Sequence, residues 1–288
     1  MATPTLGPVG LWSFELRFGE DAAIRRAAAE IEALGYGALW IPGGVDGGVL
    51  ADVERLLAAT RRVAVATGIL NIWKHRPEEV ADWFHGLPEA HRSRVLLGLG
   101  VSHGPLIGDV WQRPLAAMER FLDGLEGAGV PRDQLCLAAL GPRMLELAAR
   151  RTAGAHPYLV PPEHSRRARE ILGPGALLAP EQGVILETDP ERARAVAREG
   201  IALYARLPNY RRSWRRLGFA EAEFDPPSDR LLEALFAWGE PAAIAARVAE
   251  HRAAGADHVC VQVVRGARGG DLDGLVAACR SLAPVLLG

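Results

Sequence analysis

The sequence has few of the residues that build disulfide frameworks or metal sites. Cys136, Cys260 and Cys279 are an odd number of cysteines without CxxC spacing, and their apolar surroundings predict small buried side chains. The eight histidines show no HxH or HExxH spacing, so we expect no metal. His258 opens an apolar run and is expected to be a core residue with satisfied hydrogen bonds.

Lysine is almost absent as well. Lys74 stands alone among many arginines and is flanked by His75, Arg76 and two glutamates. A lysine that forms a Schiff base needs an apolar, desolvated pocket to stay neutral. The sequence therefore disfavours an aldolase-type mechanism.

Neither an excess of charge nor a long apolar run is present. The net charge is -2 and the pI is about 6.5, and the arginines alternate with glutamates, which disfavours a nucleic acid partner. No apolar run approaches the roughly 20 residues that cross a bilayer, and the start of the chain lacks the pattern of a signal peptide. We therefore expect a cytoplasmic protein with no membrane partner.

What the sequence does have is an alternation of short apolar runs with amphipathic, Ala- and Arg-rich segments. Continuous apolar runs are typical of parallel strands buried on both faces, and one-sided apolar stripes are typical of the helices that connect them. The strand candidates are 9–12, 38–41, 63–70, 95–100, 135–140, 156–160, 184–187 and 258–264. The pattern predicts an α/β fold, a (β/α)8 TIM barrel, as a single domain over residues 1–288.

One segment interrupts the alternation. Residues 204–227 contain several arginines and aromatics without a clear period, and long irregular segments in compact domains are usually functional or partly helical. We expect an excursion of the seventh strand/helix loop region. It forms either a short helix with Tyr210 and Trp214 packed on the barrel edge or a lid over a pocket.

The positions after the strands are where a barrel of this kind builds its active site. Trp12, Ser13, Trp73 and Trp111 are candidates for substrate contacts, because large aromatics can wall a slot for a planar ring. The alternative is that the tryptophans close the barrel core. Gly98, Gly100 and Gly104 would let a ligand approach the main chain without a Cβ clash.

A second cluster follows the sixth predicted strand. Pro161 and Pro162 end that strand, and Glu163 and His164 open a helix whose free N–H groups favour an anion. Arg166 or Arg167 would add a charge-assisted bond to a phosphate. The alternative is an ordinary helix start with a solvated basic face.

Several segments, in this order, resemble the bacterial luciferase-like superfamily, and more narrowly its branch that uses the deazaflavin coenzyme F420. They are LGYGALWIP, VATGILNIW, RVLLGLGVSH, GAHPYLVPPEH, LPNYRRSWRRLGF and AGADHVCVQV. The resemblance implies a flavin or deazaflavin at the carboxyl rim of the barrel. It also implies a non-prolyl cis peptide bulging from the third strand near Ile69, Leu70 and Asn71, with the cofactor phosphate on the amides near Glu163 and His164.

Carried onto this sequence, the resemblance implies a set of cofactor-binding residues. These are Pro42, Leu70, Asn71, Gly100, Val101, Gly141, Tyr158, Glu163, His164 and Arg167. His103 is the catalytic candidate, because an imidazole exchanges protons near neutral pH, and Glu181 with Gln182 form a second candidate pair. The second predicted strand ends in Pro42, Gly43 and Gly44, without the histidine found in sugar-phosphate dehydrogenases of this branch.

The function we expect is hydride transfer between coenzyme F420 and a small organic substrate whose identity stays open. One alternative is an FMN-dependent luciferase-like monooxygenase. Another, from a different class, is a non-catalytic protein that binds the deazaflavin or flavin. The resemblance also makes a homodimer plausible.

Overall fold

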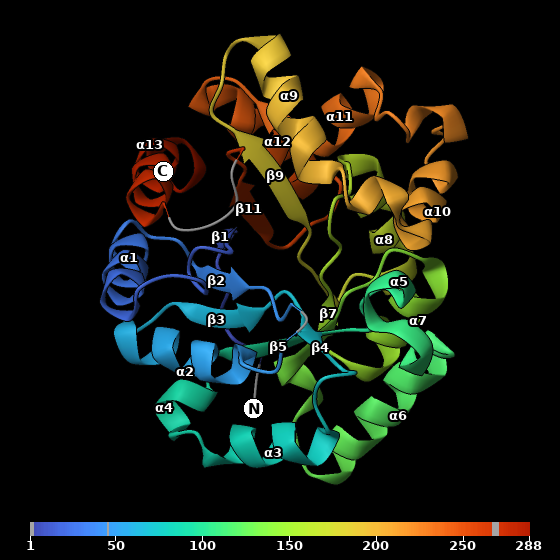
Figure 1. Ribbon diagram of the computed structural model, residues 1–288. Helices are drawn as coiled ribbons and strands as arrows, with labels where there is room; N and C mark the ends of the chain where they lie inside the picture. The colour runs from blue at the N-terminus through green and yellow to red at the C-terminus, as the bar shows by residue number, and fades with distance from the viewer. Residues whose placement is uncertain (1–2, 45, 267–270) are drawn as a thin grey trace.

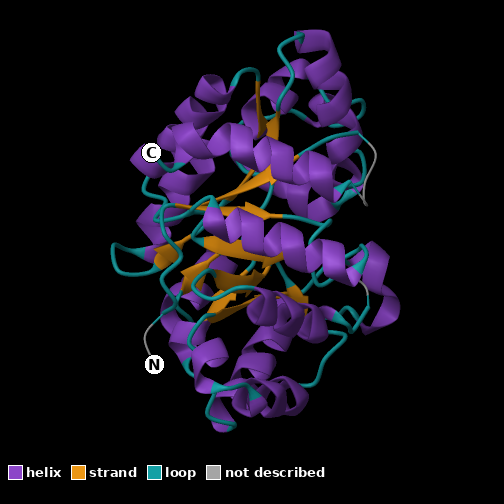
Figure 2. Ribbon diagram, turned by 90° about the vertical axis from the view of Figure 1, so that its left-hand side faces the viewer, coloured by secondary structure: helices purple, strands orange, loops and turns teal. Residues whose placement is uncertain are grey.

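The computed structural model describes residues 3–44, 46–266 and 271–288. Its strands, all parallel, form one curled sheet at the centre of the molecule, and helices surround this sheet (Figure 1). Seen from the side, the strands run through the middle of the molecule between layers of helices (Figure 2). The predicted α/β architecture with a parallel, curled sheet is confirmed.

The described residues contain eleven strands in this sheet. They are β1 (Val9–Trp12), β2 (Ala38–Ile41), β3 (Ala64–Thr67), β4 (Leu70–Asn71), β5 (Val95–Gly100), β6 (Leu135–Leu137), β7 (Gly154–Ala155), β8 (Leu177–Leu178), β9 (Glu181–Ile185), β10 (Phe236–Trp238) and β11 (Val259–Val263). Their order is β10-β9-β11-β1-β2-β3-β5-β6-β7-β8, with β4 paired to β5. Every pairing joins strands that run in the same direction.

Helices connect and cover these strands. They are α1 (Asp21–Ala33), α2 (Val49–Ala59), α3 (Pro77–Gly86), α4 (Glu89–Arg92), α5 (Gly104–Ile107), α6 (Pro114–Gly127), α7 (Pro142–Arg151), α8 (Pro162–Leu172), α9 (Pro190–Ile201), α10 (Pro208–Arg216), α11 (Asp229–Leu235), α12 (Pro241–Ala253) and α13 (Leu272–Leu286). Four short 3-10 helices are η1 (Gly108–Val110), η2 (Arg132–Gln134), η3 (Tyr204–Arg206) and η4 (Glu221–Glu223). The last helix, α13, packs against the first, α1.

Two residues between β8 and β9 make backbone hydrogen bonds to the strands on either side. The N–H of Ala179 donates to the carbonyl of Ala155, 2.9 Å away, and the N–H of Cys260 donates to the carbonyl of Pro180 at 2.9 Å. Ala179 thus bonds to β7 on one side, and Pro180 bonds to β11 on the other. Strands β8 and β9 are therefore one path through the sheet, interrupted at residues 179–180.

Both faces of the strands are buried, as the continuous apolar runs indicated. In β2, Leu39 and Ile41 belong to the core between sheet and helices, whereas Ala38 and Trp40 belong to the core inside the curl. His258 also lies inside, where its Nδ1 donates to the Gly7 carbonyl at 2.8 Å and its Nε2 accepts from the Trp40 indole at 3.1 Å. The prediction of a satisfied core histidine is confirmed.

Several predicted strand boundaries were wrong, including that of the strand predicted at 135–140, which ends at Leu137. The strand predicted at 156–160 lies instead at Gly154–Ala155, because Pro157 has no N–H to donate and Leu159 has a φ of 52°. The strand predicted at 184–187 starts earlier, at Glu181, and ends at Ile185. The strand predicted at 63–70 is interrupted by a cis peptide between Gly68 and Ile69, where the resemblance placed one.

Residues 204–227 contain η3, α10 and η4. Tyr210 and Trp214 of α10 are buried in a second apolar cluster with Phe224 and Phe236, which lies beside β9 and β10. The Trp214 indole donates to the Leu159 carbonyl at 3.2 Å. This hydrogen bond joins α10 to the loop that follows β7.

Gly98 in β5 marks a close approach between two strands. A Cβ at this position would lie 2.0 Å from the carbonyl oxygen of Thr67 in β3, which belongs to the backbone and has little room to move. We expect Gly98→Ala to lower the free energy of unfolding by about 1 to 3 kcal/mol, the usual cost of overpacking. Guanidinium unfolding followed by circular dichroism measures this loss.

The matched control is Gly127→Ala at the end of α6, where a Cβ would meet no atom within 4 Å. We expect this substitution to change the free energy of unfolding by roughly 0.5 kcal/mol or less, because no clash occurs and alanine suits a helix. Equal stability of the two variants would contradict the packing argument.

Candidate functional site

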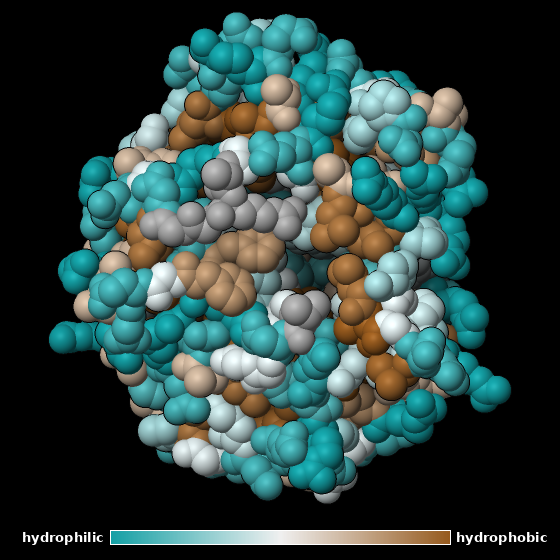
Figure 3. Space-filling model, in the orientation of Figure 1, coloured by the Kyte–Doolittle hydropathy of each residue, from teal (hydrophilic) through white to brown (hydrophobic). Residues whose placement is uncertain are grey.

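The carboxyl ends of the strands face the viewer in Figure 1, where α5 and the loops after β2 and β11 lie. The same face is hollowed near its centre, and apolar surface borders the hollow on one side (Figure 3). Leu106 and Val110, in α5 and η1, are 42% and 63% exposed. These observations place the candidate site at this rim.

Aromatic side chains gather at the carboxyl end of β1. Trp12 is 2% exposed, and its indole donates to the Gly68 carbonyl at 3.0 Å, next to the cis peptide. Its ring packs edge-on against Phe14 and lies 5.4 Å from the ring of Tyr158. A planar ligand would therefore lie across the rim, above Trp12, and not inside the curl.

Trp73 and Trp111 lie elsewhere on the rim and share one acceptor. Their indole N–H groups donate to the same carbonyl, that of Val101, at 2.7 and 2.8 Å. The structure thus brings together Trp73 and Trp111, while Trp12 stands apart from them. Both indoles are half-buried.

The glycines near the bulge are explained by the protein's own packing. A Cβ on Gly100 would lie 2.5 Å from the Ile69 side chain, and one on Gly43 would lie 2.1 Å from the Ile69 carbonyl. A Cβ on Gly104 would approach the Trp111 ring to 3.1 Å. The missing Cβ atoms make room for the bulge and the indole, so these glycines alone carry no evidence for a ligand.

The loop after β2 is held from below by an arginine that the sequence analysis missed. Arg17 is 4% exposed and donates to the carbonyls of Pro42 and Gly43, both at 2.8 Å, and to the carboxylates of Asp46 and Asp52. Asn71, also buried, donates to the Gly44 carbonyl at 3.3 Å. Pro42 and Asn71 are thus brought to one side of the rim.

Leu70 and Ser13 are fully buried there. Leu70 belongs to the main core and pairs with Leu99 across the sheet. Ser13 is 1% exposed, donates to a carboxylate oxygen of Glu15 at 2.7 Å and accepts the Leu16 N–H at 3.2 Å. The hydroxyl of Ser13 is therefore engaged within its own loop.

His103 lies on the opposite side, at the start of α5. Its ring is 5.5 Å from that of Tyr210, and its Nδ1 is buried without a hydrogen-bond partner among the described residues. Burial lowers the pKa of the imidazole, while a hydrogen bond with Asn209 acts in the opposite direction. A neutral ring with one uncommitted nitrogen can accept a proton or a hydrogen bond from a ligand.

The starts of α7 and α8 form the second part of the site. Gly141 caps α7, and Arg216 of α10 lies against it, since a Cβ on Gly141 would be 3.2 Å from an Nη of this arginine. The Arg216 guanidinium makes no hydrogen bond or ion pair with the residues that the structure describes. A cation beside a helix N-terminus is unfavourable unless an anion lies between them.

His164 lies at the same place, where the neutral ring can only accept a further hydrogen bond. It is 5% exposed, its Nε2 donates to the Leu140 carbonyl at 3.1 Å, and its Nδ1 is buried without a partner. Its pKa is lowered to about 4, mainly by burial and also by the nearby Arg167 and Arg216, while the hydrogen bond to Leu140 acts in the opposite direction. An anion bound here would offset the mutual repulsion of Arg167 and Arg216.

Glu163 leaves this place free of negative charge. Its carboxylate turns toward Arg166 and Arg167 along the exposed side of α8, and Arg167 also donates to the Arg216 carbonyl at 2.6 Å. The structure therefore joins α8 to α10 and gathers Gly141, His164, Arg167 and Arg216. Arg216 was missed by the sequence analysis, although the run of arginines in α10 with few acidic neighbours was its signal.

Tyr158 connects the two parts of the site. Its hydroxyl donates to Gln262 of β11 at 2.9 Å, and its ring lies between those of Trp12 and Tyr204. Burial raises the pKa of this phenol well above its usual value. It is therefore a neutral phenol at the mouth of the curled sheet.

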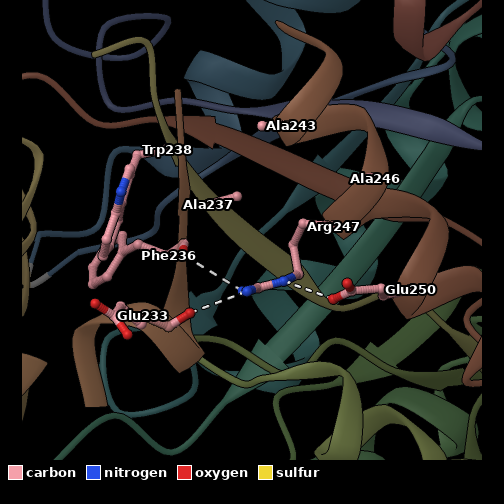
Figure 4. Close-up of a pocket in the computed structure, with 8 residues that line it drawn as sticks. All are labelled: Glu233, Phe236, Ala237, Trp238, Ala243, Ala246, Arg247 and Glu250. Atoms are coloured by element: carbon pink, nitrogen blue, oxygen red, sulfur yellow. Dashed lines mark hydrogen bonds and ion pairs between the residues drawn. The ribbon is translucent and has the colours of Figure 1, made fainter. Parts of the chain in front are cut away.

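A cavity of about 250 Å³ lies away from the rim, between α11, β10 and α12 (Figure 4). Arg247 crosses it, donating to the carbonyls of Glu233, Ala234 and Phe236 and pairing with Glu250. Because these bonds satisfy the end of α11 and the edge of β10, we interpret the cavity as a packing feature. The described residues contain no cluster of potential metal ligands and no helix that is both long and apolar enough to cross a membrane.

A sequence profile of the luciferase-like monooxygenase family matches residues 125–258. Among solved structures, an F420-dependent secondary alcohol dehydrogenase in complex with an F420-acetone adduct is 13% identical, with a TM-score of 0.72 and 100% of both chains covered. The F420-dependent tetrahydromethanopterin reductase from Methanopyrus kandleri is 15% identical, with a TM-score of 0.68, covering 98% of this chain and 99% of that one. No curated protein matches the sequence.

A flavin enzyme has a similar fold. The oxygenating constituent of a 3,6-diketocamphane monooxygenase from Pseudomonas putida, in complex with FMN, is 14% identical, with a TM-score of 0.66, covering 98% of this chain and 97% of that one. At these identities the solved structures show the fold. With the family match, they confirm the predicted resemblance to the luciferase-like superfamily and the prediction of an enzyme.

Proposed function

The chain resembles the luciferase-like enzymes in sequence and fold, and we propose that it is an oxidoreductase that transfers a hydride between coenzyme F420 and a small organic substrate. The observation that carries this proposal is the uncommitted Arg216 guanidinium together with the N-terminus of α7 that it lies against. They lie on the same rim as the aromatic mouth. This arrangement suits a planar ring with an anionic tail.

The residues present fit the phosphate of such a cofactor. Two helix starts supply the positive ends of their dipoles, and Gly141 leaves the space beside Arg216 free of a Cβ. The Glu163 carboxylate is held away by Arg166 and Arg167, so it does not repel an anion. Arg167 and Arg216 would hold the phosphate by charge-assisted bonds.

When bound, the deazaflavin supplies or accepts a hydride at carbon and behaves like a nicotinamide. The chain's own residues position the two reactants, since Trp12 and Tyr158 form the floor and the bulge at Ile69 borders the mouth. His103 is the rim group that can hold a proton, through its uncommitted Nδ1. Holding both reactants in register supplies much of the rate enhancement.

The test is a titration of the folded protein with coenzyme F420 and, separately, with FMN. We expect saturable quenching of deazaflavin fluorescence and weaker binding of FMN, because the quoted motifs resemble the F420 branch. Tighter binding of FMN would instead support the monooxygenase alternative. Binding of neither cofactor to protein with a folded circular dichroism spectrum would refute the proposal.

Turnover separates an enzyme from a binding protein. Reduced coenzyme F420 bound to the protein is mixed with enones, imines or ketones in a stopped-flow instrument. We expect reoxidation with at least one class of substrate. A bound cofactor that none of these substrates oxidises would favour the non-catalytic alternative.

A further inference from the structure

Three buried polar side chains between α8, α12 and β9 form a continuous chain of hydrogen bonds. Ser165 of α8, His251 of α12 and Gln182 of β9 are all 0% exposed. The Ser165 hydroxyl lies 2.8 Å from Nδ1 of His251, and Nε2 of His251 lies 3.0 Å from Oε1 of Gln182. Glu181, the preceding residue of the strand, points to the opposite face and accepts the Leu159 N–H at 3.0 Å. Because the serine and the histidine are closed to solvent, they cannot reach a substrate, and the chain has another role.

The direction of every bond in this chain is fixed from its Gln182 end. The amide Nε2 of Gln182 lies 2.8 Å from the carbonyl oxygen of Gly183 and 3.0 Å from that of Leu235, the last residue of α11. Since both contacts are carbonyls, this atom is the NH2 group, and Oε1 is the acceptor. Burial lowers the pKa of His251 to about 3, so its ring is neutral at pH 7 and holds one N–H. This N–H is on Nε2, and the bare Nδ1 accepts the hydroxyl proton of Ser165.

The first turns of α8 connect this chain to the proposed phosphate site at the start of α7. His164, the neighbour of Ser165, donates to the carbonyl of Leu140 at 3.1 Å, and Leu140 directly precedes the N-cap of α7. Arg167, two residues after Ser165, donates to the carbonyl of Arg216 at 2.6 Å. Helix α8 is therefore bonded to the phosphate site through His164 and Arg167, and to the interior of the protein through Ser165.

Directional bonds at two successive positions constrain a helix in a way that apolar packing does not. The hydrophobic effect has no preferred direction, so packing alone tolerates a small rotation of α8 about its axis. A hydrogen bond weakens steeply when its angle changes, and breaking one inside the protein leaves a buried polar group without a partner, which is costly. The bonds of His164 and Ser165 therefore fix the rotation of α8 relative to α7 and to the sheet.

We propose that Ser165, His251 and Gln182 are positioning residues of the phosphate site, which hold the start of α8 in the orientation that anion binding requires. The proposal rests on the proposed function, which identifies the anion as the phosphate of the cofactor. No bond is made or broken covalently along the chain. Because coupling between two places in a protein is reciprocal, an anion bound at the start of α7 also changes the hydrogen bond between Ser165 and His251.

Nitrogen-15 NMR of the histidine rings tests this coupling with inorganic phosphate as the probe and without any cofactor. In the unmodified protein we expect His251 to show a protonated Nε2 and a bare Nδ1, and we expect added phosphate to shift the Nδ1 signal until it saturates. His258 is the control, because it is also buried but bonds to Gly7 and Trp40 at the amino end of β11, and its signals should not move. A signal of His251 Nδ1 that phosphate does not shift would overturn the proposal.

Removing the hydroxyl tests whether the chain matters for affinity. We expect Ser165→Ala to weaken phosphate binding about fivefold or more, because α8 loses its bond to His251. Ser213→Ala is the matched control, since this serine of α10 is 1% exposed and its hydroxyl has no partner among the described residues. It lies on the same helix as Arg216, so its substitution also reports any general disturbance near the site. Equal affinities of the two variants for phosphate would overturn the proposal.

The two measurements keep two failures apart. If phosphate shifts the His251 signal and Ser165→Ala loses affinity but coenzyme F420 does not bind, the proposed function is wrong and the positioning role stands. If coenzyme F420 binds but phosphate leaves the His251 signal unchanged, the positioning role is wrong and the proposed function stands. The NMR measurement uses the unmodified protein, so it decides the question even where Ser165→Ala does not fold.

Discussion

Lowering the pH from 6 to 5 should cost this protein on the order of 4 kcal/mol of stability. Four histidines, His156, His164, His251 and His258, are at most 5% exposed. Burial lowers the pKa to about 4 for three of them and to about 3 for His251. Each keeps a neutral ring that donates one N–H to a buried acceptor.

The direction follows from proton binding in the two states. Unfolded histidines take up protons below about pH 6.5, whereas the folded ones do not until about pH 4. The stability contributed by the histidines is therefore full above about pH 6.5 and falls as the pH drops toward 4, by about 1.4 kcal/mol per pH unit for each histidine. Glu181 acts in the opposite direction, because burial raises its pKa to about 8. Below about pH 6.5 its effect on stability cancels that of one histidine. Above that pH it makes stability fall as the pH rises toward 8.

Urea unfolding at pH 7, 6 and 5, followed by circular dichroism, measures the effect. Since domains are typically stable by about 5 to 15 kcal/mol, the loss brings the protein close to acid unfolding. The variant His85→Gln changes an exposed histidine and should keep the same slope. A free energy of unfolding that is flat from pH 7 to pH 5 would contradict the neutral state of the buried rings.

Reversing the charge of Arg216 should weaken the binding of coenzyme F420 about a hundredfold or more. The arginine is uncommitted at the start of α7, and a glutamate there would both remove a charge-assisted bond and repel the phosphate. The same fluorescence titration gives the dissociation constant of Arg216→Glu. Because Arg216 is exposed, we expect little change in the free energy of unfolding.

Arg212→Glu is the matched control for this effect. It reverses the same charge on the same exposed helix, where Arg212 donates only to the Pro208 carbonyl of α10. We expect less than about a fivefold change in affinity, since exposed charges at a distance are screened by salt. Equal losses of affinity in both variants would indicate a general charge effect. Unchanged affinity in Arg216→Glu would show that the cofactor phosphate does not bind at the start of α7.

The sequence predicted most of the fold because buried parallel strands require uninterrupted apolar runs. The runs at 9–12 and 38–41 match β1 and β2 to the residue. Strand β10 was missed because Phe236–Trp238 follows α11 without a breaker, and Gly239 comes only after the strand. The short β8 was missed because two residues carry no period.

The candidate site was predicted less completely, because its groups meet only through the fold. The helix start at Glu163 and His164 was visible in the sequence, since prolines precede it. The arginine that completes this place comes from α10, more than fifty positions later in the chain, and no local pattern distinguishes Arg216 from its neighbours. Arg17 was missed for the same reason, because its acceptors at Pro42 and Gly43 belong to another loop.

The single carbonyl of Val101 that serves both Trp73 and Trp111 has an optical consequence. The fluorescence of an indole depends on the acceptor of its N–H. A rotation of the peptide group that carries the Val101 carbonyl would therefore change the emission of Trp73 and Trp111 together. The arrival of a colourless substrate at the rim would then be visible in the protein's intrinsic spectrum without any label.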